Sequence, residues 1–336
     1  MNVEVEPFSL PLSTPLETAA GIIETRRGFL VRVDIEGTPG LGEATPLSGW
    51  TESRPACEDA LRAVDDPTSA LSDNRLADTP AARHAVSLAT LDARARAAGR
   101  PLYRYLGGDG RVEAVPINAT VGDGTPEAAA AAVETAVREG YPAVKLKVGA
   151  RDPEADLDRV TAVRSKAPDV ELRLDANGAW SERTAKRLLP EFADRDVSVL
   201  EQPLSAGSLD AHARLRDRGV DIALDEGVVE HGFDAVLAAD AAAVLVCKPM
   251  ALGGIDVARN VVRSARIAGV DAVVTTTIDG AVARAGAVHL AASLPGLRPC
   301  GLGTGGLLGT DLRSDVAPVT DGKAAVPQGK GNIPPR

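Results

Sequence analysis

The sequence predicts an α/β protein in which a small N-terminal α+β capping domain precedes a (β/α)7β TIM-like barrel. Three observations lead to this prediction. Near Val115 the chain changes from alternating strands and turns to a regular succession of short aliphatic runs and Ala/Arg/Glu-rich helical segments. Eight such runs alternate with seven helical segments, and eight strands close a barrel. Charged residues also end five successive runs at nearly constant spacing.

Residues 1–107 carry the signals of the capping domain. Within "GFLVRVDIEGTPGLGEATPL" we expect two alternating strands joined by a turn at residues 36–40. Helices are expected over residues 54–64 and 80–98, and "GRP" ends the second. The segments "STPLETAAGIIETRR" (13–27) and "SGWTES" (48–53) are expected to be mobile loops. Residues 13–27 are the candidate lid over the barrel.

Residues 108–312 are expected to form the barrel, with the active site at the C-terminal ends of its strands. The predicted strands are "VPINATV", "AVKLKV", "VELRLDA", "VSVLEQP", "VDIALDE", "AAVLVCKP", "DAVVTTT" and "LRPCGLG". Helical segments such as "TPEAAAAAVETAVREG" separate them, which predicts a parallel sheet. Residues 313–336 are expected to form a C-terminal tail that packs back on the capping domain.

Composition narrows the class of protein and of partner. With 44% hydrophobic and only 3% aromatic residues, the chain is expected to form an aliphatic core. A net charge of −10 argues against a nucleic-acid surface. No run approaches the ~20 apolar residues of a membrane helix, and the N-terminus does not resemble a signal peptide. Three distant cysteines and four histidines predict neither a disulfide framework nor a zinc site, so we expect a cytoplasmic protein.

Five charged residues give the strongest functional signal, at intervals of 28, 26, 24 and 23 residues: Lys147, Asp175, Glu201, Asp225 and Lys248. Each ends a predicted strand or nearly does, and each interval is one βα unit. The C-terminal strand ends of a barrel meet at one mouth. A single Asp after a strand is commonly a helix cap or a turn residue. Caps do not explain three acids in register with a lysine in register on either side, so we expect the five side chains to face one another.

The residue types in this set suit one kind of chemistry. Asp175, Glu201 and Asp225 form an all-oxygen ligand set for Mg²⁺, with Mn²⁺ as a substitute. Lys147 and Lys248 would lie on either side of the metal. Because a neighbouring cation lowers the pKa of a lysine, either can serve as a general base. The arrangement therefore predicts removal of the proton α to the carboxylate of a small-molecule substrate, with the metal stabilising an enediolate.

The motifs "KLKVG", "LRLDANGAW", "LEQPL", "ALDEG" and "CKPMALGGI" resemble those of the enolase superfamily, in its muconate-lactonizing subgroup. Within the subgroup the chain is most similar to the o-succinylbenzoate synthase family of menaquinone biosynthesis. The resemblance implies that Lys147 and Lys248 are the acid/base residues and that the three acids bind Mg²⁺. It also implies a lyase reaction, the dehydration of 2-succinyl-6-hydroxy-2,4-cyclohexadiene-1-carboxylate to 2-succinylbenzoate.

Four further residues are expected to support the site: Lys145, Arg173, Asn177 and Gln202. Lys145 shares the strand face of Lys147, because side chains alternate along a strand. Arg173 has the same relation to Asp175, and an ion pair inside the barrel is its equally weighted alternative. Asn177 and Gln202 flank the expected metal ligands.

The segment "GLGTGG" (301–306) matches G-x-G-x-x-G, but no βαβ unit follows it, so we reject a dinucleotide site. Substrate contacts are expected instead from four residues around this loop and the seventh strand: Thr276, Gly301, Gly303 and Thr304.

Other functions use the same residues and stay open. N-acylamino-acid racemases, dipeptide epimerases and cycloisomerases need the same two lysines and metal. Dipeptide epimerases generally have an acidic pair in the loop after strand eight, whereas "GLGTGGLLG" has no acid before Asp311. A non-catalytic metal-binding barrel is disfavoured because all five residues are present. The sequence also leaves open a homo-oligomer.

Overall fold

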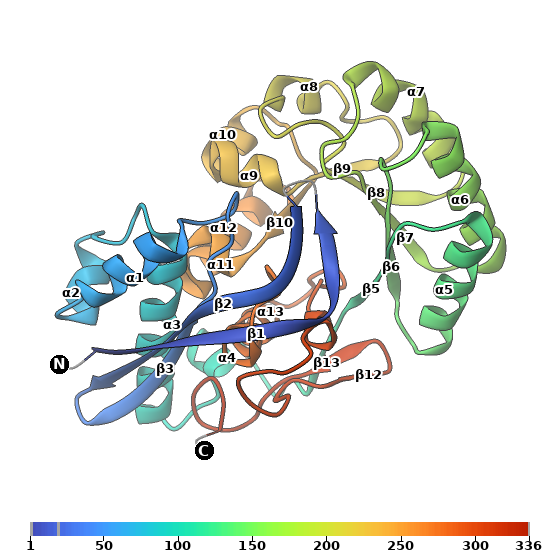
Figure 1. Cartoon of the computed structure of the whole chain (residues 1–336). Coiled ribbons are helices and arrows are strands. Elements are labelled where there is room, and N and C mark those ends of the chain that lie inside the picture. The colour runs from blue at the N-terminus through green and yellow to red at the C-terminus, as the bar shows by residue number, and fades with distance from the viewer. Residues whose placement is uncertain (1–2, 19–20, 335–336) are drawn as a thin grey trace.

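The computed structural model describes residues 3–18 and 21–334, and its centre is a parallel sheet that curves into a barrel (Figure 1). Its seven strands pair in the order β11-β10-β9-β8-β7-β6-β5. They are β5 (Asn118–Val121), β6 (Ala143–Lys147), β7 (Glu171–Asp175), β8 (Val197–Glu201), β9 (Asp221–Leu224), β10 (Val244–Cys247) and β11 (Asp271–Val274). Two parallel bridges, Ile117 with Cys300 and Thr275 with Gly301, join the two edges. The predicted fold class is confirmed, although the eighth strand is reduced to these bridges.

The strands are buried because the barrel has side chains on both of its faces. Every residue of β10 is buried, and so are four of the five residues of β7. This burial explains the nearly continuous aliphatic runs, which are typical of parallel sheets covered on both sides.

Helices cover the outside of the barrel. They are α5 (Pro126–Arg138), α6 (Pro153–Lys166), α7 (Glu182–Ala193), α8 (Leu209–Ala213), α9 (Glu226–His231), α10 (Phe233–Ala238), α11 (Pro249–Leu252), α12 (Ile255–Ile267) and α13 (Ala281–Ala292). The local sequence sets where several of them begin. The side chains of Thr125, Asp152 and Ser181 accept hydrogen bonds from the first turns of α5, α6 and α7. Proline follows Thr125 and Asp152, where a missing N–H costs nothing.

The capping domain is a three-stranded antiparallel sheet against helices. Its elements are β1 (Val3–Thr18), β2 (Gly21–Ile35), β3 (Thr38–Ala44), α1 (Arg54–Arg62), α2 (Pro67–Ser72), α3 (Pro80–Ala97) and α4 (Leu102–Tyr105). The turn between β2 and β3 places Glu36 at φ 53° and Gly37 at φ 80°, as a tight hairpin requires. The sheet lies close to α3, since a Cβ on Gly42 would stand 1.9 Å from the carbonyl oxygen of Ala85.

The expectation of a mobile loop over residues 13–27 is wrong for the described residues. Both sides of this segment belong to the β1–β2 ribbon, where Leu16 pairs with Ile23. A register shift between Pro11 and Leu16 hides the alternation from sequence analysis. Figure 1 shows the ribbon reaching from the capping sheet toward the barrel, where Leu12 forms a bridge with Leu308. Residues 19 and 20 lie outside the described residues.

The first predicted barrel strand divides at Ile117. Its first part, β4 (Ala114–Pro116), pairs with β13 (Lys323–Ala325), which pairs with β12 (Val319–Thr320). Beyond β13, the C-terminal residues form hydrogen bonds with both parts of the chain. The amide of Asn332 donates to Asp92 in α3, and its carbonyl oxygen contacts His289 in α13.

None of the helices in the described part of the chain has the length and hydropathy that crossing a bilayer requires.

Candidate active site

The register of the barrel strands sets three of the predicted residues side by side. Lys147 of β6 pairs with Asp175 of β7, and Asp175 pairs with Glu201 of β8. Asp225 follows β9, and Lys248 follows β10. The five side chains therefore reach the same mouth because they end neighbouring parallel strands.

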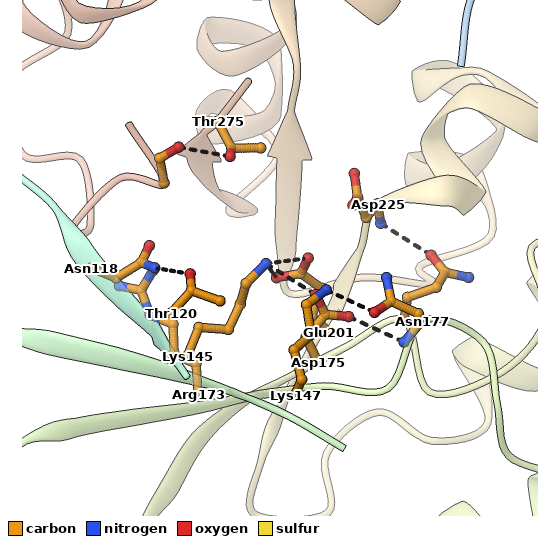
Figure 2. A network of polar contacts seen from close by, with 12 residues as sticks. Asn118, Thr120, Lys145, Lys147, Arg173, Asp175, Asn177, Glu201, Asp225 and Thr275 are labelled. Carbon is orange, nitrogen blue, oxygen red and sulfur yellow. Dashed lines mark hydrogen bonds and ion pairs between the residues drawn. The ribbon is translucent and has the colours of Figure 1, made fainter. Parts of the chain in front are cut away.

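The lysines form close ion pairs with the three acids, and Figure 2 shows those of Lys145 and Lys147 with Asp175 and Glu201. Lys147 Nζ lies 2.6 Å from Asp175 Oδ2, and Lys248 Nζ lies 2.6 Å from Asp225 Oδ2. Lys145 Nζ lies 2.8 Å from Glu201 Oε1 and 3.0 Å from Asp175 Oδ2. The structure thus brings the five expected side chains together at one mouth, where the lysines contact the acids directly and Lys145 joins them.

Burial and the neighbouring charges shift the protonation equilibria of the cluster. Burial, with the adjacent Asp175 carboxylate, raises the pKa of Glu201 to about 7. Burial also raises the pKa of Asp225 to about 6, although Lys248 opposes this shift. For Asp175, burial is outweighed by Lys145 and Lys147, which hold its pKa well below the usual range. Burial favours the neutral amine of Lys145, but the surrounding carboxylates outweigh it and raise the pKa of that amine.

The three acids fit a hard divalent cation. Asp225 Oδ1 is buried and has no hydrogen-bond partner, an arrangement that is costly unless a cation or donor reaches it. Carboxylate oxygens are the ligands that Mg²⁺ prefers. Among the described residues no three Asp, Glu, His or Cys side chains stand together as a ready metal-binding group. Here the ammonium group of Lys145 bridges Asp175 and Glu201 instead.

Two amide side chains hold this cluster in place. Gln202 Oε1 accepts hydrogen bonds from the backbone amides of Asp225 and Gly227, both at 3.0 Å. It thereby fixes the turn that carries Asp225. Asn177 Oδ1 accepts a 2.7 Å hydrogen bond from Lys147 Nζ, and its amide nitrogen donates to Glu226.

Arg173 differs from the other expected supporting residues. Its Nε donates to Glu171 at 2.8 Å, and its Nη1 donates to the carbonyl oxygen of Pro299 at 2.7 Å. These contacts turn the guanidinium toward the N-terminal end of the barrel and away from Asp175. The geometry therefore agrees with its alternative interpretation, an ion pair inside the barrel.

A cavity of about 560 Å³ adjoins the cluster at Lys145. Of the four predicted substrate contacts, Gly301, Gly303 and Thr304 line this cavity. Thr276 does not line it, but its hydroxyl lies 2.7 Å from the Thr304 hydroxyl.

Sequence analysis missed Trp50, which belongs to the segment expected to be a loop. The ammonium group of Lys248 lies 3.3 Å from the centroid of the Trp50 ring. The chain has only two tryptophans, and a tryptophan in a short turn was the available signal. Asn118 was also missed: it lines the same cavity as Lys145 and lies near it in Figure 2.

Comparison with known proteins agrees with this geometry. Residues 127–332 match the family described as "Enolase C-terminal domain-like". The L-Ala-D/L-Glu epimerase of Bacillus subtilis is 29% identical over 87% of this chain and 85% of its own length. Its substrate-liganded structure superposes with a TM-score of 0.88 at 27% identity, covering 99% of this chain and 98% of that one.

Two other proteins widen the comparison. Muconate cycloisomerase 1 of Rhodococcus opacus is 29% identical over 98% of this chain and 94% of its own length. A dipeptide epimerase from Enterococcus faecalis V583, solved with Mg and a dipeptide, has a TM-score of 0.87 at 25% identity. That alignment covers 98% of each chain. These relatives are isomerases with different substrates.

Proposed function

Since the chain belongs to the enolase superfamily, in its muconate-lactonizing/mandelate racemase subgroup, we propose that it removes the proton α to the carboxylate of a small substrate with two lysines and a divalent metal. One observation carries the proposal. Lys147 and Lys248 come from different strand ends, and each lies 2.6 Å from an acid of the same buried cluster. Two amines on opposite sides of one site suit one proton acceptor and one cationic partner.

The residues divide the chemistry between them. One of the two lysines, as the amine, takes the α-proton, and the other, as the ammonium ion, stabilises the charge that develops on the carboxylate. When bound by Asp175, Glu201 and Asp225, a divalent cation supplies the positive charge that makes the enediolate accessible. Asn177 orients Lys147 through its 2.7 Å hydrogen bond, and Trp50 covers Lys248. In a dehydration, the lysine that took the proton returns it to the departing hydroxide.

The loop after the eighth strand favours a substrate without an ammonium group. Residues 301–310 contain no acid, and Asp311 is engaged elsewhere. Its Oδ1 accepts hydrogen bonds from the amide of Ala281, at the start of α13, and from the amide of Leu312, the next residue in the chain. This loop disfavours a dipeptide substrate but not other carboxylates. From the resemblance of its motifs to the o-succinylbenzoate synthase family we propose, as the specific reaction, the dehydration of 2-succinyl-6-hydroxy-2,4-cyclohexadiene-1-carboxylate to 2-succinylbenzoate.

Isomerisation is the second candidate, and the names of the relatives favour it. One is an epimerase of L-Ala-D/L-Glu and another is a muconate cycloisomerase, although both are similarly distant from this chain. Proteins that share a fold and a site often act on different substrates.

A parallel assay tests both levels of the proposal. Purified protein with Mg²⁺ is given the cyclohexadiene substrate, N-succinyl amino acids, dipeptides or cis,cis-muconate, and product and α-proton exchange in deuterated water are followed by NMR. Turnover of the cyclohexadiene substrate alone supports the dehydration. An epimerised or cyclised product from another substrate would show that the protein is an isomerase instead. Absence of Mg²⁺-dependent exchange with every substrate would overturn the common mechanism.

A further inference from the structure

The cavity beside Lys145 continues through the wall of the barrel. Its inner end is lined by Asn118, Lys145 and Thr275, which lie near one another in Figure 2. Its outer end is lined by Ala132 of α5 and by Tyr141, which follows that helix. One continuous cavity thus joins the buried cluster to the helical layer outside the strands.

The strand pairing explains this opening. Where the sheet closes, Ile117 bridges Cys300, and the amide of Asn118 donates to the Cys300 carbonyl oxygen. After Gly301 the chain leaves β5 and enters the short 3₁₀ helix η1 (Thr304–Leu307). The next residues of β5, Ala119 and Thr120, line the cavity, and Thr120 is exposed. In the described part of the chain only short strands and loops follow η1, so no eighth helix covers this side.

The composition of the walls indicates what the opening can receive. The face of α5 toward the cavity consists largely of small side chains: Ala128, Ala129, Ala132, Thr135 and Ala136. Two exposed carboxylates also line the cavity, Glu139 and Asp123, and the second of them pairs with Arg151. Methyl groups leave room where larger side chains would fill it. The hydroxyls of Thr120, Thr304 and Tyr141 add hydrogen-bond donors, and no hydrogen bond of the Tyr141 hydroxyl is found among the described residues. A flexible chain that carries a carbonyl group matches both properties.

We propose that this cavity, the α5 pocket, is a subsite for the acyl arm of the carboxylate substrate, the part remote from the α-carbon. The inference rests on the proposed function, because it requires the α-carbon at the lysine cluster. The inner end meets that cluster at Lys145, whose Nζ contacts Glu201 at 2.8 Å. A substrate held there extends its arm between β5 and Gly301 toward Ala132. The pocket thereby selects substrates by the length of that arm.

Position 132 allows a test with a matched control. Ala132→Phe fills the pocket from the exposed side of α5, whereas Ala131→Phe places the same ring on the same helix outside the pocket. With N-hexanoyl and N-acetyl amino acids, we expect Ala132→Phe to lower kcat/KM for α-proton exchange about tenfold for the hexanoyl substrate, as a blocked apolar contact does. We expect changes below about twofold for the acetyl substrate and for Ala131→Phe with either. Equal losses for both substrates, or equal losses in both variants, would overturn the proposal.

A second measurement is independent of turnover. The native cysteines Cys57, Cys247 and Cys300 are all buried, so a cysteine introduced in Ala132→Cys is the accessible thiol. We expect 2-succinylbenzoate to slow its alkylation by N-ethylmaleimide several-fold, and benzoate, which lacks the arm, to have no effect. Ala131→Cys should be alkylated at the same rate with either ligand. Protection without any exchange activity would refute the proposed function but keep the pocket, whereas activity without protection would refute the pocket alone.

Discussion

The two ends of the same barrel strands both carry acids, but they pair them with different cations. At the N-terminal end, Arg298 Nε lies 2.7 Å from Asp271, and its Nη2 lies 2.7 Å from Asp221. At the C-terminal end, lysines contact Asp175, Glu201 and Asp225. The arginine-paired acids Asp221 and Asp271 are 43% and 33% exposed, whereas the three lysine-paired acids are at most 7% exposed.

This difference separates a structural cluster from a chemical one. An arginine remains protonated and bridges several acids with a rigid fork of donors, so it ties strands together. A lysine can lose its proton, and burial tunes how readily it does so. The chain contains thirty arginines and only seven lysines, yet three lysines stand at the mouth. The choice of lysine there is explained by proton transfer, which arginine does not support.

The largest effect is expected from removing either mouth lysine. Lys147→Ala and Lys248→Ala should each lower kcat for α-proton transfer by about 10²–10⁴-fold, the usual contribution of a general acid or base. Lys147→Arg keeps the positive charge but not the proton acceptor, so it should be nearly as inactive. NMR of α-proton exchange in deuterated water measures the loss, and circular dichroism checks the fold. A Lys147→Arg enzyme within tenfold of wild type would contradict the distinction between the two ends.

The position of these lysines was predictable because the interval between strand ends is a property of the βα unit. Because one charged residue ends each strand, the repeat predicts that Lys147, Asp175 and Glu201 lie in register. In the structure Lys147 pairs with Asp175, and Asp175 pairs with Glu201, on neighbouring strands. The direction of a long side chain is not set by this repeat. Arg173 has the same strand relation to Asp175 as Lys145 has to Lys147, but its guanidinium turns to Glu171.

Contacts between the capping domain and the barrel were beyond sequence analysis. The cation–π contact joins Trp50 to Lys248, which belong to distant parts of the chain, and no periodic pattern relates them. The ribbon formed by residues 13–18 and 21–27 was missed because prolines and a register shift interrupt its alternation. The eighth strand was identified by its aliphatic run, but tertiary closure leaves it only two bridges.

Glu43 is a buried acid that is held by backbone amides and not by a lysine, so its titration can be followed through the pH dependence of stability. It is fully buried, and its carboxylate accepts hydrogen bonds from the amides of Gly280 and Ala283 at the start of α13. Burial raises its pKa to about 7. Because the folded pKa lies above the unfolded value, this group contributes stability below about pH 4.5 that is lost as the pH rises through 7.

Glu43→Gln should remove this pH dependence. The free energy of unfolding of wild type, relative to Glu43→Gln, should fall by up to about 3 kcal/mol between pH 4.5 and pH 8. The glutamine also leaves one backbone amide without its acceptor, but that cost does not depend on pH. Urea unfolding at a series of pH values measures the difference. A constant difference across the range would show that Glu43 does not titrate there.

Arg298 should affect stability and leave catalysis unchanged. Arg298→Met leaves Asp221 and Asp271 without their cation and should lower the free energy of unfolding by about 1–3 kcal/mol, limited by their partial exposure. Because the cluster lies at the opposite end from the lysines, kcat should change less than threefold. Arg32→Met, which breaks an exposed pair with Glu6, is the matched control and should cost about 0–1 kcal/mol. A loss of kcat comparable to that of Lys147→Ala would mean that the two ends are coupled.

Among the substitutions at the active site, the smallest effect on activity is expected from replacing Trp50. Its aromatic ring contacts the ammonium group of Lys248. Lys248 Nζ lies 3.3 Å from the ring centroid while it also contacts Asp225 at 2.6 Å, so the ring restricts the amine to one side. A cation–π contact contributes about 0.5–2 kcal/mol, which corresponds to a decrease of about 2- to 30-fold in kcat/KM for Trp50→Leu. Trp50→Phe keeps a weaker face and should fall between Trp50→Leu and wild type. Equal activities of the Phe and Leu variants would show that the ring acts on Lys248 only by excluding water, which any apolar side chain of similar reach can do.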